Sequence, residues 1–167
     1  MKRGLLILVL AVVALNVNAQ LKVASCDYSK ITDSLPATKQ AINDLLEMKK
    51  EADLEIKTMQ EELQKKFLKY QQEEADMNSY MKENMEKDLQ QMQQNAIARE
   101  RELQERLQIA QVKLFQPIEE NVVKVVAEVA EKEKYDYVVD VKGVMFATPK
   151  YNITNKVLDI LLKENTD

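Results

Sequence analysis

The chain contains 167 residues, with 24 Lys and Arg against 28 Asp and Glu, no His, no Trp, one Cys and two Gly. The lack of His excludes a Ser-His-Asp triad and a Cys-His pair, and a single Cys leaves no ordinary zinc site. Two glycines are too few for a glycine-rich phosphate-binding loop. Aromatic residues make up 5% and charged residues 31%, which is typical of long solvated helices. We therefore expect no enzyme, with no catalytic residues, metal or cofactor.

Residues 1–19 have the pattern of a secretory signal peptide. Lys2 and Arg3 precede an uninterrupted apolar run at 5–15, which is too short to span a bilayer. We expect cleavage after Ala19, so that the mature chain begins at Gln20; an N-terminal membrane anchor is the alternative. Loss of the two basic residues leaves 22 basic and 28 acidic residues, a net charge of −6. This charge does not favour binding to nucleic acid or to an anionic membrane.

A short strand is predicted at 21–26, where side chains alternate up to Cys26. We interpret Cys26 as a small apolar residue of this strand. One alternative is a lipid-modified cysteine, since the four residues 23–26 resemble a lipoprotein box. A thiol that is free or paired between chains is another. Lys22 lies in the stretch that such a box would keep uncharged, which favours the strand.

Residues 37–116 contain neither Gly nor Pro and are predicted to be helical, with Ser34 as the cap and Pro36 in the first turn. Apolar residues recur every three or four positions and form a narrow seam typical of a coiled coil. The seam consists of Ile42, Leu45, Ala52, Ile56, Met59, Leu63, Leu89, Met92, Ala96, Leu103, Leu107, Ala110 and Leu114. Such a segment would form one rod of about 120 Å or two arms of about 60 Å each. The best turn candidate is 76–79.

The last third of the chain changes period. β-branched and aromatic residues at 135–141 and 144–148, separated by a turn with Gly, predict a β-hairpin. A more apolar helix is predicted between Pro117 and Tyr135. A short amphipathic helix capped by Thr154 closes the chain, and this cap accounts for the glycosylation-like pattern there without modification.

This order of elements resembles the Skp (OmpH) family of periplasmic chaperones. The residues that carry the resemblance are Leu21-Lys22-Val23-Ala24, Leu35-Pro36, Pro117-Ile118 at the head of the last long helix, Tyr135-Asp136-Tyr137-Val138-Val139-Asp140, Val144-Met145-Phe146-Ala147 with Pro149, and Asn152-Ile153-Thr154 before Val157-Leu158. The resemblance implies an α+β fold, in which a long antiparallel helical hairpin (35–134, tip near 74–82) joins a small β body (20–34 and 135–167). It also implies that three bodies form a β-barrel on trimerisation.

The resemblance further implies an ATP-independent periplasmic holdase, which binds unfolded outer-membrane β-barrel proteins in a cavity between three hairpins. Flexible methionines and aromatic residues of the arms are the candidate client-binding residues. They are Met59, Phe67, Tyr70, Met77, Tyr80, Met81, Met85 and Met92. The candidates for the body core and the oligomer interface are Val23, Val138, Val139, Val141, Val144 and Phe146. Familiar members are basic whereas this mature chain is acidic, so we expect no lipopolysaccharide or membrane site.

Other interpretations stay open at this stage. Each methionine of the stripe could serve only to pack the two arms together. A structural coiled-coil scaffold or spacer of the cell envelope is the alternative function, and it predicts a dimer or rod without affinity for unfolded chains. A glycosidase with paired carboxylates is the third hypothesis, but no concave scaffold is apparent to position such a pair.

Overall fold

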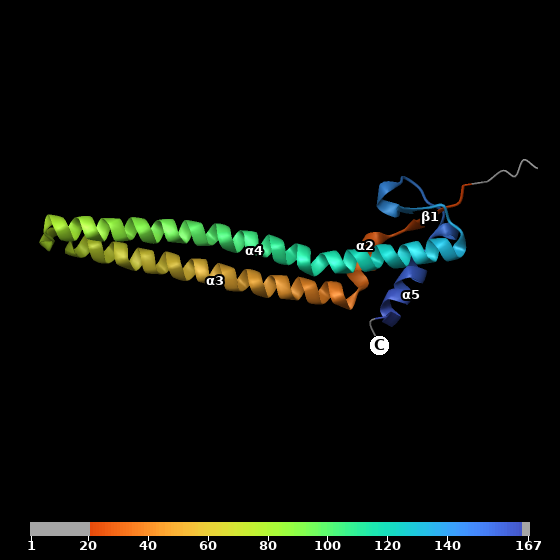
Figure 1. Cartoon of the computed structure of the whole chain (residues 1–167), viewed down its shortest axis with the longest axis horizontal. Coiled ribbons are helices and arrows are strands. Elements are labelled where there is room, and N and C mark those ends of the chain that lie inside the picture. Colours follow the sequence, from red (N-terminus) through yellow and green to blue (C-terminus); the bar gives the residue numbers. More distant parts are fainter. Residues whose placement is uncertain (1–20, 165–167) are drawn as a thin grey trace, which may run out of the picture.

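A long helical hairpin projects from a small body in the computed structural model (Figure 1), which describes residues 21–164. The arms of the hairpin are α3 (Pro36–Glu73) and α4 (Ser79–Glu133), which run antiparallel. The predicted α+β class with a long hairpin and a small strand region is confirmed, whereas the trimeric barrel stays a prediction. The predicted signal peptide at 1–19 lies outside the described residues. No helix in 21–164 is apolar enough over a sufficient length to cross a membrane.

The predicted seam lies along the face where the two arms meet. Ala52 and Leu103 are buried there, and the other seam residues are half-buried, with Ile42 as the exposed exception. An apolar stripe at three- and four-residue steps stays on one side of a helix, so each arm covers the stripe of the other. A narrow seam therefore holds the two arms together between the tip and the body, and most of the other residues of this stretch face solvent.

The chain reverses direction at residues 74–78, inside the interval 74–82. A single 3-10 turn spans Glu74–Asp76, and Met77 then becomes extended. The side chain of Asn78 caps α4, because its Oδ1 accepts the N–H of Met81 at 2.9 Å. Asn at this position satisfies a backbone donor that the first helical turn leaves without a partner.

The helix predicted between Pro117 and Tyr135 is confirmed, but it does not begin at Pro117, because α4 continues through this residue. Proline removes the N–H that would bond to the carbonyl of Lys113. Both residues are exposed, and water can solvate that carbonyl. The same helix therefore forms one arm of the hairpin and, beyond Pro117, one wall of the body.

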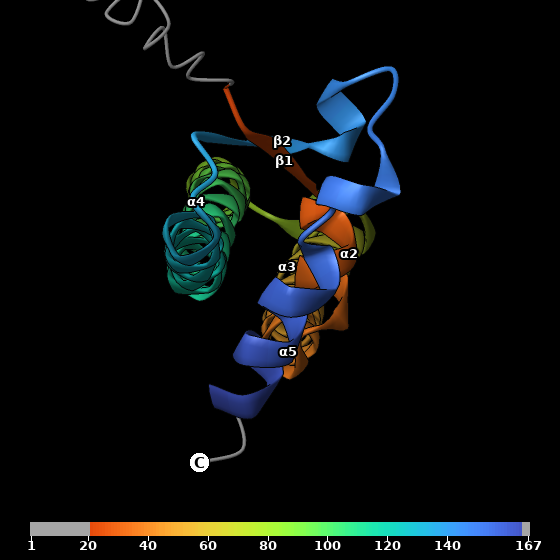
Figure 2. The same ribbon diagram turned by 90° about the vertical axis from the view of Figure 1, so that its right-hand side faces the viewer.

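The body contains two short parallel strands, β1 (Val23–Cys26) and β2 (Tyr137–Asp140), in which Ala24 lies opposite Val138. Helices α2 (Tyr28–Ser34) and α5 (Thr154–Glu164) pack beside the end of α4, as the view onto this end shows (Figure 2). The buried core of the body consists of Ala24, Cys26, Ile31, Leu35, Val122, Val125, Val129, Ile153, Val157 and Leu161. Residues from both ends of the chain thus close around the end of α4.

The predicted β-hairpin at 135–148 is wrong. Its first half contains β2, but residues 144–148 form no strand within the chain. The Asp140 carboxylate accepts the N–H of Lys142 at 3.1 Å and starts a 3-10 turn at Val141–Gly143. This turn directs the chain away from β2, which pairs with β1 instead.

The predicted cap at Ser34 is also wrong. Ser34 is the last residue of α2, and its hydroxyl donates to the carbonyl of Lys30 at 2.7 Å. Leu35 is the N-cap residue of α3 and makes no side-chain cap. Pro36 occupies the first turn as expected, where its missing N–H costs nothing.

Thr154 joins α5 to β1 instead of capping its own helix. Its Oγ1 accepts the N–H of Asp27 at 2.8 Å, at the end of β1. The N–H of Thr154 is in turn donated to Oδ1 of Asn152 at 3.0 Å. The first residue of α5 therefore holds the C-terminal helix against the end of the first strand.

Candidate functional site

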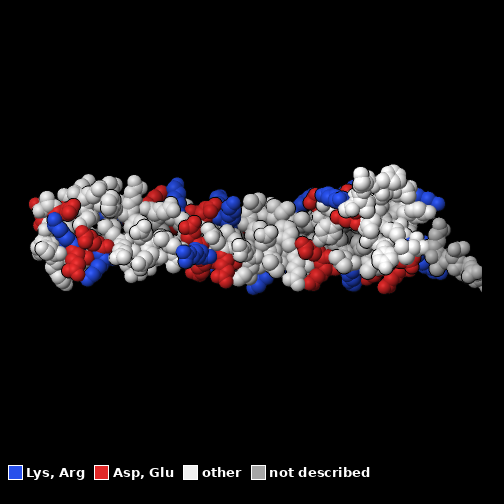
Figure 3. Space-filling model, turned by 90° about the horizontal axis from the view of Figure 1, so that it is seen from above, with Lys and Arg blue, Asp and Glu red and all other residues white. Residues whose placement is uncertain are grey.

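Exposed apolar side chains, rather than a cluster of metal-binding residues, distinguish the surface of the part of the chain that the structure describes. Within 21–164 no group of three His, Cys, Asp or Glu is placed to hold a metal ion. Figure 3 shows charged residues in clusters along the hairpin, separated by uncharged stretches. The exposed large apolar side chains of the two arms are Ile42, Leu46, Leu54, Phe67, Leu68, Tyr80, Met81, Ile97, Ile109, Val112 and Val123.

The eight candidate client-binding residues fall into three groups. Phe67, Tyr80 and Met81 are exposed. Met59, Met77, Met85 and Met92 are half-buried, and Tyr70 is buried. The half-buried methionines that lie on the seam contribute to packing of the arms. The alternative that a methionine serves only to pack the two arms together therefore applies best to Met59 and Met92.

Tyr70 is engaged within the hairpin. Its hydroxyl donates to Oε1 of Glu86 on the opposite arm at 2.7 Å. This hydrogen bond to a carboxylate raises the pKa of Tyr70 to about 12, because ionisation would place two negative charges in contact. Through this hydrogen bond Tyr70 connects the two arms near the tip. A second contact, the ion pair between Lys66 and Asp88, lies close to it.

A third connection lies midway along the hairpin, where Arg99 bonds Glu55 with two nitrogen atoms. Nε lies 2.6 Å from Oε1 and Nη2 lies 3.2 Å from Oε2, and Nη1 reaches Glu102 at 2.7 Å. The hydrogen bond from Arg99 lowers the pKa of Glu55. The sequence contains four Arg and many Glu residues, and the two partners lie 44 positions apart, so no local signal identified this pair.

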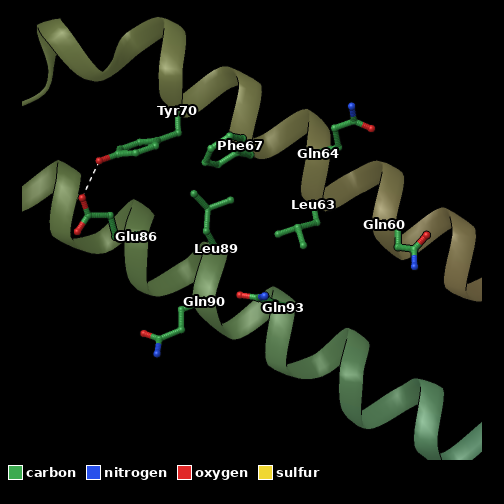
Figure 4. A pocket seen from close by; sticks show the side chains of 9 residues that line it. All are labelled: Gln60, Leu63, Gln64, Phe67, Tyr70, Glu86, Leu89, Gln90 and Gln93. Carbon is green, nitrogen blue, oxygen red and sulfur yellow. Dashed lines mark hydrogen bonds between the residues drawn. The ribbon is translucent and has the colours of Figure 1, made fainter.

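An open groove of about 550 Å³ lies between the arms, on the body side of Tyr70. Figure 4 shows Leu63, Phe67 and Leu89 pointing into the space between the helices, with Gln60 and Gln93 on its two sides. The remaining lining residues are Gln64, Tyr70, Glu86 and Gln90. Glu86 is the one charged lining residue, and its carboxylate accepts the Tyr70 hydroxyl. Sequence periodicity identified the seam but could not show that the arms leave a space here.

A second groove, of about 370 Å³, lies beside the strands of the body. Its lining residues are Val23, Ala24, Ser25, Val139, Val144, Phe146, Ala147, Thr148 and Tyr151. The hydroxyl of Ser25 is buried without a hydrogen-bond partner among the described residues. Such a group costs free energy unless something supplies a partner.

The six predicted body-core residues contribute unequally to burial within the chain. Val138 is half-buried and packs against the core. Val139 and Val141 are half-buried, whereas Val23, Val144 and Phe146 are exposed. Phe146 retains 84% of its accessible surface and the neighbouring Met145 is fully exposed. The apolar segment 144–147 therefore lies on the surface of the single chain.

The interpretation of Cys26 as a small apolar strand residue is confirmed. Cys26 is a buried free thiol at the end of β1. Burial, with the negative charges of Asp140 and Asp27 nearby, raises the pKa of this thiol to about 11. The thiolate is the reactive form, so the folded protein suppresses the reactivity of its cysteine.

We expect iodoacetamide at pH 8 to leave Cys26 of the folded chain unmodified and to alkylate it in urea. Mass spectrometry of the intact chain measures the extent of the reaction. The protection should decrease as the pH rises toward the raised pKa of about 11. A Ser79→Cys variant in a Cys26→Ser background is the control, because position 79 is exposed and should react at pH 8. Equal rates for Cys26 in the folded and unfolded chains would contradict this prediction.

Comparison with known proteins agrees with this architecture. The model of the OmpH-like outer membrane protein family matches residues 22–161. The chaperone protein Skp of Photorhabdus laumondii is 30% identical over 151 residues, which cover 87% of this chain and 89% of that protein. A crystal structure of an OmpH-like protein from Caulobacter crescentus superposes with a TM-score of 0.77 at 16% identity. That match covers 87% of this chain and 86% of the other, and it supports the fold.

Proposed function

Because this chain belongs to the OmpH-like family of outer membrane proteins, we propose that it is an ATP-independent holdase chaperone of the periplasm. Its clients would be unfolded outer-membrane β-barrel proteins, which it keeps from aggregating. The observation that carries the proposal is the large amount of apolar surface left exposed along both arms. The 30% identical chaperone Skp, which matches over most of the chain, supports the same role.

The exposed residues suit this kind of client. An outer-membrane protein before insertion exposes strands with alternating apolar residues, and their unpaired edges favour aggregation. A chaperone that holds many such chains needs weak, adaptable contacts over a long surface. Phe67, Tyr80 and Met81 offer area near the tip, and the thioether of Met81 is flexible and polarizable. Leu46 and Leu54 extend the exposed apolar surface toward the body.

We also propose that three chains associate through their bodies, so that the hairpins surround a common cavity. A parallel sheet of two short strands is too small to be stable by itself. The groove beside it, with the buried Ser25 hydroxyl and the exposed segment 144–147, offers the apolar surface and the unpaired polar group that an adjoining chain could cover. The acidic mature chain favours apolar client contacts that depend little on salt, and no site for lipopolysaccharide is proposed.

The test uses the mature chain from Gln20 and an outer-membrane β-barrel protein diluted from urea. We expect the chain to suppress light scattering by the client without ATP, and to carry it into one soluble complex in sedimentation velocity. The double variant Tyr80→Ser/Met81→Ser should suppress aggregation severalfold less well, because it removes apolar area at the tip. Ser79→Ala is the matched control at the same turn.

A scaffold or spacer protein is the second candidate, and the narrow apolar seam between the arms favours it. It predicts a client that pellets as though it were alone, together with a dimer or an extended rod. That outcome would reject the chaperone proposal.

A further inference from the structure

We propose that the groove between α3 and α4 at Leu63, Phe67 and Leu89 is a binding site for an extended, uncharged polypeptide segment with apolar side chains at alternate positions. The proposal rests on the proposed chaperone function and assigns part of client binding to the inside of each hairpin. A single chain contains the complete site, so binding there does not require the cavity between hairpins.

The spacing of the apolar residues fits an extended segment. Leu63 and Phe67 are four residues apart on α3, which places them about 6 Å apart along the helix axis. Alternate side chains of an extended strand are about 6.6 Å apart. Two successive apolar side chains on one face of a bound strand can therefore contact Leu63 and Phe67 of α3. Leu89 of α4 would contact the same two bound side chains from the opposite arm.

The polar groups of the groove fit a peptide backbone rather than a charged ligand. Gln60 and Gln93 lie on the two sides of the space (Figure 4). Neither side-chain amide bonds to another residue in the part of the chain that the structure describes. An amide offers both donors and an acceptor, which matches the N–H and C=O groups of an extended chain. The one carboxylate of the lining, Glu86, already accepts the Tyr70 hydroxyl.

Phe67 provides an exposed apolar surface at this site. It keeps 47% of its accessible surface although it lines the groove, so a bound side chain would cover part of an aromatic ring. The contacts of Tyr70 with Glu86 and of Lys66 with Asp88 join the arms on the tip side of the groove. The pair of Arg99 and Glu55 joins them on the body side. The groove is therefore an opening between two fixed points of the hairpin.

The experiment measures binding of a short synthetic peptide to the full mature chain by fluorescence anisotropy. Val alternates with Thr in the peptide, Lys residues flank it, and a fluorophore is attached to its N-terminus. We expect Phe67→Ala to weaken binding about tenfold, because the lost ring removes most of the apolar contact. Leu68→Ala is the matched control, since Leu68 is the next residue, is also 47% exposed and does not line the groove. Gln93→Phe should fill the groove and abolish binding, and circular dichroism checks that each variant is folded.

Three results would overturn the inference. Equal binding by the Phe67→Ala and Leu68→Ala variants would place the peptide elsewhere. Equal binding of a peptide with its Val and Thr residues in separate blocks would show that alternation is not recognised. A change in sedimentation of the free Phe67→Ala chain would indicate that a second copy occupies the groove. If the chain suppresses client aggregation but binds no peptide, this inference fails and the proposed function stands; without suppression, the proposed function itself fails.

Discussion

A Phe146→Asp substitution is expected to convert the proposed trimer into monomers at micromolar concentration. Phe146 is 84% exposed in the single chain and lines the groove beside β1 and β2. If an adjoining chain covers this side chain, each copy loses about 1.5–3 kcal/mol of apolar burial when the ring is removed. The carboxylate adds a desolvation cost, because burying an unpaired charge is more expensive than burying a neutral polar group.

Sedimentation velocity of the chain that starts at Gln20 measures this effect directly. Tyr80→Asp is the control, because Tyr80 is an exposed aromatic residue at the far end of the hairpin and its substitution should leave the proposed trimer intact. We further expect the Phe146→Asp chain to lose most of its ability to suppress client aggregation, because separated hairpins enclose no cavity. A Phe146→Asp chain with the sedimentation of the unaltered protein would contradict the proposed interface.

The long hairpin could be predicted from the sequence because its information is local and periodic. The seam residues from Leu45 to Leu114 repeat at helical spacing, and the partner that covers them is another stretch of the same pattern. The Asn78 cap is likewise a short-range signal, since its side chain bonds a backbone N–H three residues away. What the seam could not reveal was the groove at Phe67, which depends on how far apart the arms lie.

The body was predicted less well because its pairings join residues from opposite ends of the chain. Strand β2 forms its backbone hydrogen bonds with β1, where Val23 lies opposite Tyr137. It therefore does not need residues 144–148 as a partner strand. Local turn patterns therefore suggested a hairpin that does not form. Thr154 shows the same effect, since its hydroxyl accepts the N–H of Asp27 rather than capping the adjacent helix.

The exposure of Val144 and Phe146 could not be read from their residue types. Both are apolar and strand-forming, which predicted burial in a sheet, yet both are exposed in the single chain. An apolar segment on the surface of a small body is typical of an interaction surface. The burial predicted from the residue types of Val144 and Phe146 would therefore occur only when another chain covers them. The Phe146→Asp experiment tests whether one does.

The largest loss of stability is expected for Leu161→Ala, which should lower the free energy of unfolding by about 3 kcal/mol. Leu161 has no accessible surface and belongs to the core that α5 forms with α2 and the end of α4. Removal of its isobutyl group forfeits apolar burial and leaves a cavity, because the surrounding helices can close it only in part. Urea denaturation followed by circular dichroism, at a fixed protein concentration, measures the change.

Leu162→Ala is the matched control for Leu161→Ala, with the same substitution one residue further along α5. Leu162 retains 38% of its accessible surface, so less burial is lost and a smaller cavity is created. We expect it to cost about 1 kcal/mol or less. The hairpin carries most of the helical circular dichroism signal. A first transition at low urea with little loss of ellipticity would therefore show that the body unfolds before the hairpin. Equal destabilisation by both variants would mean that α5 does not pack through Leu161, and the assignment of the core to this face of α5 would then be wrong.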